Sequence, residues 1–204
     1  MFDFGVTKME RRKLPTPCNE EVQKYLQRWD SLENYVLQEK SLNKLFHQLV
    51  PENDEIEKIL IKASTLNDFY STNIYSIFPV AKHIHDLKID DRLKRGDGAL
   101  VSDIANIEIS GKKKYFYLFA TKYCSHHNAN AYPIYDSYVE KVLMYYKKED
   151  RFAKFKLDDL RDYETYKNIL IQFANFYGIA EYGLKDLDRY LWQLGKEYFP
   201  KTYN

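Results

Sequence analysis

Cysteine is scarce in this chain and long apolar runs are missing. Only two cysteines, Cys18 and Cys124, occur among 204 residues, and they stand far apart. Two isolated cysteines do not form a disulfide framework, so we expect a reduced environment. No run of about 18 apolar residues is present, which excludes a transmembrane helix, and residues 1–13 lack the apolar core of a signal peptide. These absences predict a cytoplasmic protein with no membrane partner.

Phosphate-binding loops and metal motifs are also lacking. The Gly-Asp-Gly segment at 96–98 is not followed by the pattern of a phosphate loop. Cys124, His126 and His127 lie close together, but their spacing is not that of a zinc site, and no second Cys/His cluster accompanies them. No serine has the flanking glycines of a nucleophile elbow, so the sequence gives no sign of a Ser-His-Asp catalytic triad. We therefore expect no metal ion and no cofactor.

Neither sign of charge dominates, because 31 Lys and Arg stand against 30 Asp and Glu. A net charge of +1 gives no general argument for nucleic-acid binding. Residues 112–148, however, contain seven lysines and two acidic residues, a local balance of +5. Such a basic segment suits a polyanion, although a solvated helix face has the same composition.

Apolar and aromatic residues are abundant and follow a helical period. The 19 tyrosines and 12 phenylalanines are expected mostly in the core. The periodicity predicts an all-α globular bundle: a single helical domain over residues 1–204, built of two closely packed lobes. Expected helices cover residues 19–29, 32–49, 56–70, 74–87, 163–176 and 184–198, with another after Asp136.

Local signals predict several helix boundaries. Asp30 and Glu33 have the spacing of a capping box, and Asn53 or Asp54 is expected to cap the third helix. Pro79 is expected to bend or restart the fourth.

The middle of the chain is less regular. Residues 92–98 predict a polar loop. Residues 104–109 and 114–119, on either side of Ser110-Gly111, predict a short β-hairpin. The alternative is a helix that already begins at Tyr115.

The most informative feature is a lysine on an apolar helical segment. Lys122 is followed 14 residues later by Asp136, which comes after a proline break and opens the next amphipathic helix. A buried lysine can act as an amine nucleophile once its pKa is lowered, and a carboxylate at a helix start can stabilise a developing cation. The alternatives are a lysine with its amine in water and an aspartate favoured by the helix dipole.

Two segments together resemble the helix-hairpin-helix DNA glycosylase superfamily. Residues 63–73, continuing to Phe-Pro-Val-Ala at 78–81, are similar to an apolar helix of that family that ends in a small polar tip. Residues 119–139 are similar to the helix and Pro-x-x-Asp turn that carry the catalytic aspartate, here Asp136. The resemblance implies a glycosylase-like core at about residues 54–148, with the terminal helices packed on it.

This resemblance implies a DNA N-glycosylase that flips a damaged or modified base out of the duplex and cleaves its N-glycosidic bond. Asp136 would stabilise the oxocarbenium-like sugar, and Lys122 would attack C1′, which adds AP-lyase activity. The family's hairpin is altered here, with only Gly111 in it, and Lys122 stands closer to the aspartate than is usual. Lys113 or Lys114 is therefore the alternative nucleophile, and a monofunctional enzyme that uses water is another alternative.

The resemblance also implies contacts with double-stranded DNA, made by a monomer. The polar tip would fill the space left by the base, and basic residues would contact phosphates: Ser71, Thr72, Asn73, Lys112, Lys113, Lys114, His126 and His127. Four tyrosines are expected in the base pocket: Tyr123, Tyr132, Tyr135 and Tyr138. The divergent hairpin makes a modified base of phage DNA one candidate substrate. Such a substrate would imply a role in phage defence.

Two other classes of function stay open. One is a non-catalytic helical module for nucleic-acid binding, defence or regulation, with Lys122 and Asp136 as a structural ion pair. The other is a protein-interaction scaffold, which predicts no salt-dependent binding of DNA. Base release that is lost on Asp136→Asn would distinguish the enzyme from both.

Overall fold

The computed structural model describes residues 13–200, so the expectation that residues 1–13 hold no signal peptide lies, except for Lys13, outside the described residues. Within that range the fold is helical with one small antiparallel hairpin, which confirms the predicted fold class. The elements in chain order are α1 (Asn19–Asp30), α2 (Glu33–Lys44), a π-helical turn η1 (Leu45–Leu49), α3 (Ile56–Phe69), α4 (Ile77–Asp86), α5 (Asp90–Arg95), α6 (Ala99–Ala105), β1 (Asn106–Ile109), β2 (Lys112–Tyr115), α7 (Tyr117–His127), α8 (Ser137–Asp150), a 3-10 turn η2 (Asp158–Arg161), α9 (Tyr163–Phe176) and α10 (Leu184–Tyr198).

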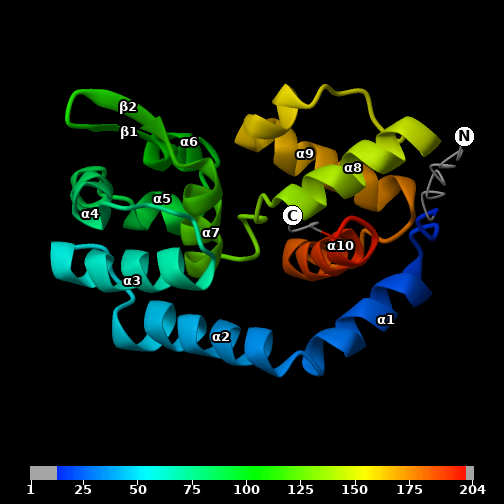
Figure 1. Ribbon diagram of the computed structural model, residues 1–204, viewed down its shortest axis with the longest axis horizontal. Helices are drawn as coiled ribbons and strands as arrows, with labels where there is room; N and C mark the ends of the chain where they lie inside the picture. The colour runs from blue at the N-terminus through cyan, green and yellow to red at the C-terminus, as the bar shows by residue number, and fades with distance from the viewer. Residues whose placement is uncertain (1–12, 201–204) are drawn as a thin grey trace, which may run out of the picture.

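The helices form two lobes that lie side by side (Figure 1). One lobe contains α3 to α7 and the hairpin, and the other contains α8, α9 and α10. Helices α1 and α2 run along one side of both lobes, with α1 against α10 and α2 against α3. No described helix is both long enough and apolar enough to cross a membrane.

Helix α7 lies on the side of the first lobe that faces the second lobe (Figure 1), and most of its residues are buried. Its buried residues include Phe119, Ala120, Tyr123 and Cys124, so it has no broad solvent-facing stripe. A helix without a solvent-facing stripe packs inside the protein. Lys122 lies in this helix and exposes only 4% of its surface.

The second lobe packs closely because α10 has a glycine where it meets α8. A Cβ atom at Gly195 would lie 2.7 Å from both the Cβ and the carbonyl oxygen of Tyr138, which is too close for any larger residue. Helix α10 also has a broad apolar face, which consists of the buried residues Leu187, Leu191 and Leu194. This contact places α10 beside the first turn of α8, where Asp136 is the N-cap residue.

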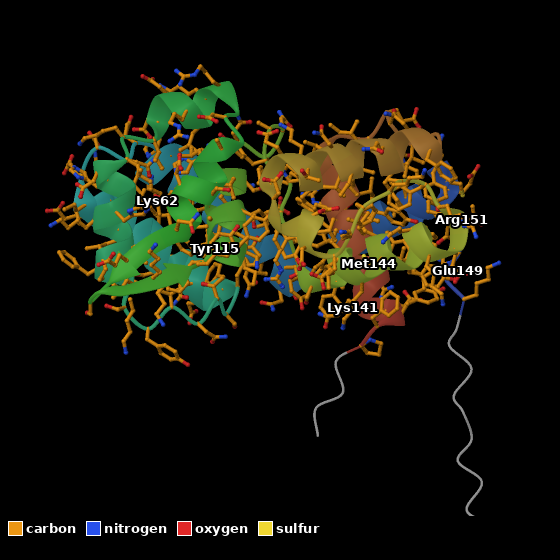
Figure 2. The ribbon with its side chains drawn as sticks, turned by 90° about the horizontal axis from the view of Figure 1, so that it is seen from above. Lys62, Tyr115, Lys141, Met144, Glu149 and Arg151 are labelled. Atoms are coloured by element: carbon orange, nitrogen blue, oxygen red, sulfur yellow. The ribbon has the colours of Figure 1, made fainter. Side chains whose placement is uncertain are left out.

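The predicted hairpin is present but shorter than expected. Ser110 and Gly111 form its two-residue turn, both with positive φ (51° and 73°), as twisted antiparallel strands require. Ile109 pairs with Lys112, and the strands extend only to Asn106 and to Tyr115, which Figure 2 labels.

Two predicted helix caps are wrong. Asp30 belongs to α1, and α2 begins at Glu33 after Leu32, without a side-chain cap. Neither Asn53 nor Asp54 caps α3, since Glu55 is at that position. The reason at Asn53 is tertiary, because its side chain accepts a hydrogen bond from the Tyr123 hydroxyl (2.6 Å) instead.

The predicted loop at residues 92–98 is only partly correct: its first four residues belong to α5, and residues 96–98 form the turn that leads to α6 at Ala99. Both helices are too short for a helical period to stand out in the sequence, and their burial against the core stabilises them. Gly96, with φ 69°, ends α5. Pro79 is the third residue of α4, and its missing N–H costs little in a first turn, where no partner is required.

Candidate functional site

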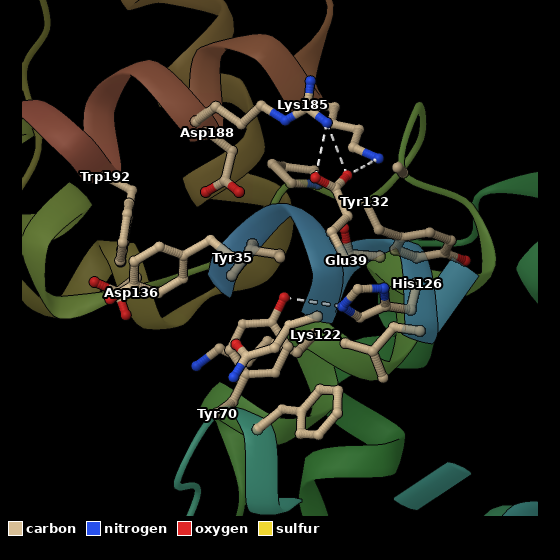
Figure 3. A pocket seen from close by; sticks show the side chains of 18 of the residues that line it. Tyr35, Glu39, Tyr70, Lys122, His126, Tyr132, Asp136, Lys185, Asp188 and Trp192 are labelled. Carbon is tan, nitrogen blue, oxygen red and sulfur yellow. Dashed lines mark hydrogen bonds and ion pairs between the residues drawn. The ribbon is translucent and has the colours of Figure 1, made fainter. Parts of the chain in front are cut away.

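A cavity of about 320 Å³ lies where the two lobes meet (Figure 3). Its walls come from α1, α2, the end of α3, α7, the loop before α8, and α10. Ligand pockets commonly start at about 300 Å³, so this cavity is large enough for a small planar molecule. Among its lining residues are both Lys122 and Asp136.

Lys122 reaches the cavity from the middle of α7. Its Nζ lies 4.9 Å from the centre of the Tyr70 ring, which comes from the end of α3. Such a distance is typical of a cation–π contact. The lysine is therefore held against an aromatic face at the cavity wall rather than directed into solvent.

Asp136 reaches the cavity from the N-terminus of α8. One carboxylate oxygen accepts a hydrogen bond from the Tyr138 backbone N–H (2.8 Å), so Asp136 caps the helix. A cap of this kind fixes the carboxylate and places it at the positive end of the helix dipole. The second oxygen stays available to a ligand.

Three aromatic rings from three helices form one wall of the cavity: Trp29 of α1, Tyr35 of α2 and Trp192 of α10. The ring centres of Tyr35 and Trp192 are 4.9 Å apart, and those of Trp29 and Trp192 are 5.9 Å apart. Arg189 lies over Trp29, and Lys196 lies over Tyr35 and Trp192. Aromatic walls flanked by cations suit a flat, electron-rich ligand.

Glu39 of α2 binds two cations of α10, which ties the two helices together across the cavity (Figure 3). Its carboxylate pairs with Lys185 and accepts from Arg189 Nη2 at 2.8 Å. Burial opposes the ionisation of Glu39, but the bonds from Lys185 and Arg189 outweigh it and hold its pKa below the ordinary value. Glu39 is therefore an ionised carboxylate with its charge already compensated.

Asp188 is different, because its half-buried carboxyl group lies in the cavity wall and has a neighbour of like charge, Asp136. Burial, and then the charge of Asp136, raise its pKa to about 8, while Lys122 opposes this shift. The surface that Asp188 keeps accessible faces the cavity that it lines. Asp188 is thus mostly protonated at neutral pH.

His126 lines the cavity as a neutral imidazole. Burial lowers its pKa to about 4, and its Nε2 is hydrogen-bonded to the Tyr70 hydroxyl at 2.9 Å. A neutral ring cannot contribute charge to a phosphate contact. The predicted role of His126 as a phosphate ligand therefore has no electrostatic support near neutral pH.

The predicted polar tip after α3 is only partly at the cavity. Ser71 lines it, but Thr72 and Asn73 do not. The Thr72 hydroxyl donates to the Asn67 side chain (2.6 Å), so it stabilises the turn. Asn73 is exposed, with a φ of 57°.

Of the four tyrosines predicted in the base pocket, only Tyr132 lines the cavity. Tyr123 follows Lys122 by one residue and so points about 100° away around the helix, into the core. Tyr135 donates to Glu140 instead. Tyr138 is not among the lining residues either, because it lies against Gly195 on the side of α8 that meets α10.

The lysines of the hairpin lie away from the cavity. Lys112, Lys113 and Lys114 are exposed on β2, and Lys113 stands opposite Glu108. None of them lines the cavity that holds Asp136. Lys113 and Lys114 are therefore poorly placed to act as the alternative nucleophile on a base in this cavity.

His127 also points away from the cavity. Its Nε2 lies 3.3 Å from both the Lys62 amine and the Asn53 amide nitrogen. Burial holds its pKa well below the ordinary value. Within residues 13–200, no group of three or more His, Cys, Asp or Glu side chains is placed to hold a metal ion.

Most residues that complete the cavity were missed in the sequence. They are Trp29, Tyr35, Glu39, Lys185, Asp188, Arg189 and Trp192. The spacing of Lys185, Asp188 and Trp192 puts them on one stripe of α10, opposite its leucines. In the sequence this stripe has the composition of a solvated helix face. Only the packing of the second lobe against α2 shows that it lines a cavity.

Comparisons with known proteins place the chain in a family without giving it an activity. The family model HI_0787_N, described as an N-terminal domain, matches residues 21–131. An uncharacterized protein of Haemophilus influenzae is 54% identical over 150 residues, which are 73% of this chain and 72% of that protein. No solved structure matches the chain. The matched segment contains Lys122 but ends before Asp136 and α10, and on these two similarities the chain belongs to the HI_0787_N family.

Proposed function

We propose that the protein is a DNA N-glycosylase that accepts a flipped, damaged or modified base in the cavity between the lobes. The observation that carries this proposal is the meeting of Lys122 and Asp136, from two separate elements, in one aromatic-walled cavity. The resemblance to helix-hairpin-helix glycosylases stays a prediction.

The shape and lining of the cavity support a base as ligand. A base inside a duplex is inaccessible, so an enzyme that acts on it must extrude it into a pocket and stack it between side chains. Tyr35, Trp192 and Tyr70 provide rings for stacking. Ser71 lies at the same cavity on an exposed turn, which gives DNA a contact beside the site.

In this proposal Asp136 stabilises positive charge on the sugar as the N-glycosidic bond breaks. The capped carboxylate is already oriented, so little reorganisation is required. The Lys122 amine attacks C1′, the base leaves with the bonding electrons and takes up a proton, and opening of the sugar ring gives a Schiff base. The amine must lose its proton before it attacks.

Borohydride trapping on a panel of duplexes tests the proposal. The panel carries oxidised, deaminated, alkylated and phage-type modified bases, one per duplex. We expect a covalent adduct with at least one duplex for the wild-type protein and none for Lys122→Ala. Asp136→Asn should lower base release by about 100-fold or more, the usual contribution of such a group. Lys82→Ala, an exposed lysine of α4 that does not line the cavity, is the matched control.

The other outcomes separate the remaining classes. Alkali-labile sites that depend on Asp136, without an adduct, would indicate a monofunctional glycosylase in which water attacks. If no duplex loses a base but DNA binds in a salt-dependent way, the protein is a binding module. Absence of both base release and DNA binding would contradict any role on DNA.

A further inference from the structure

The carboxyl group of Asp188 has no use in the proposed glycosylase chemistry, yet it faces the cavity. It extends from α10 into the cavity (Figure 3). No hydrogen bond is among the causes that set its protonation, which are burial and the charges around it. The side chain is half-buried, and it lines the cavity, so its carboxyl group is available to a ligand bound there.

The groups that face Asp188 come from every element around it. Glu39 comes from α2, Tyr70 from the end of α3, Lys122 and His126 from α7, Asp136 from the start of α8, Tyr166 from α9, and Lys185 and Arg189 from α10.

Most of these groups are already compensated. Lys185 and Arg189 bind Glu39, and His126 is neutral because burial lowers its pKa to about 4. Beside Asp188, Asp136 contributes a negative charge and Lys122 a positive charge. Ionisation of Asp188 would therefore add a second negative charge next to Asp136 without a dedicated cation.

We propose that Asp188 recognises the ligand as a neutral carboxylic acid, pairing with a planar heterocycle that has one hydrogen-bond donor next to one acceptor. This inference rests on the proposed function for the identity of the ligand as a base. It adds a specificity-determining residue to that site.

The protonation state decides which edge of a base fits. A protonated carboxyl group has one O–H donor and one carbonyl acceptor side by side, whereas a carboxylate only accepts. The neutral acid thus matches the amino–imine edge of adenine and the lactam edge of hypoxanthine or uracil. An ionised acid would instead select an edge with two donors. The rings of Tyr35 and Trp192 hold the heterocycle by stacking.

The chain itself supplies a direct probe of binding. Its only two tryptophans, Trp29 and Trp192, both line the cavity. Tryptophan fluorescence is therefore titrated with deoxyadenosine, deoxyinosine and deoxyuridine, and with N-methylated deoxyinosine and deoxyuridine that lack the donor. The full-length wild type, Asp188→Asn and Asp188→Ala are compared from pH 6 to pH 9.

We expect at least one unmethylated nucleoside to quench the wild type at pH 6, and its methylated form to bind more weakly. Asp188→Asn keeps a donor beside an acceptor, so its affinity should stay within about threefold, while Asp188→Ala should lose about tenfold or more. Wild-type affinity should fall as the pH rises through about 8, the pKa of Asp188. Asp188→Asn should not share that loss, which removes any contribution from ionisation of the nucleoside.

Three results would overturn the inference: no quenching by any nucleoside, loss of binding in Asp188→Asn equal to that in Asp188→Ala, or a carboxyl infrared band of Asp188 that is fully ionised at pH 6. The band is identified as the difference between wild type and Asp188→Asn. Failure of the glycosylase proposal is recognised separately, as nucleoside binding that persists without release of a base from any duplex.

Discussion

Two ionisable side chains, the buried Lys62 and the half-buried Asp188, differ in whether the fold provides them with hydrogen-bond partners. Lys62 is fully buried, and its amine donates to the Glu52 carbonyl oxygen (2.8 Å) and lies 3.3 Å from His127 Nε2. Burial lowers the pKa of Lys62 to about 8. Asp188 has no such partners. A buried charge with hydrogen-bond partners is part of the core, whereas a half-buried carboxyl group without them at a cavity marks a candidate site.

At the residue scale we predict that Asp188→Asn stabilises the unliganded protein, and more so at higher pH. The pKa of Asp188 rises from its ordinary value of 3.8 to about 8 on folding, so the folded state binds more protons than the unfolded state between these values. Wild-type stability therefore falls from pH 4 to pH 8, while the amide does not titrate. The gain should reach on the order of a few kcal/mol near pH 8. Chemical denaturation at several pH values measures it.

The matched control for that experiment is Asp186→Asn. Asp186 lies on the same helix and forms a side-chain ion pair with Arg189 at 3.6 Å, at the protein surface. Its substitution should change stability by less than about 1 kcal/mol at any pH. A gain for Asp188→Asn that is independent of pH would contradict the neutral state of Asp188 in the fold.

Among the helices, α8 and α9 of the second lobe both begin at an aspartate that caps the helix. Asp136 accepts from the Tyr138 N–H (2.8 Å), and Asp162 accepts from the Thr165 N–H (2.9 Å). Both aspartates satisfy backbone donors that a helix start leaves without a partner. Only Asp136 also lines the cavity.

This pair separates the structural role of an aspartate cap from a role in chemistry. Asp136→Ala and Asp162→Ala should each lower the free energy of unfolding by about 1 kcal/mol, while Asp136→Asn should preserve most of it, since asparagine also caps helices. Base release should fall in both Asp136 variants and stay unchanged in Asp162→Ala. Denaturant titrations and base-release assays on the same preparations measure the two effects. Full activity in Asp136→Asn would exclude the carboxylate from the chemistry.

At the scale of the whole molecule, the cavity depends on segments from both ends of the chain. Helix α10 packs against α1 and α8, and Glu39 of α2 binds Lys185 and Arg189 of α10. These contacts cross from the first helices to the last. The site therefore forms only when both lobes are folded together.

We predict that the two lobes unfold as one cooperative unit. Trp29 and Trp192 report on the contact between α1 and α10, whereas far-ultraviolet circular dichroism reports on all helices. Their denaturant midpoints should coincide, as in a two-state transition. Tryptophan fluorescence that changes at a lower denaturant concentration would mean that the lobes separate before they unfold.

Local chemistry accounts for the features that were predicted correctly. The amphipathic period determines the longer helices, and Ser110-Gly111 determines the hairpin turn, because these signals act within a few residues. Lys122 and Asp136 were singled out because each differs from its immediate neighbours, and their roles in chemistry stay a prediction. Helices α5 and α6 and the true partner of Asn53 were missed, because distant residues stabilise them.

The helical class and the hairpin follow from local sequence alone, which also draws attention to Lys122 and Asp136, the two residues on which the functional proposal depends. That Lys122 and Asp136 share a cavity, and that α10 contributes Asp188 and Trp192 to it, depends on tertiary contacts that no local pattern reveals. The same applies to Tyr123, which lies in the core rather than at the site. The physical reason is that periodicity tells which residues share a helix face, but packing between helices decides which face meets which, and burial then sets the charge of each group.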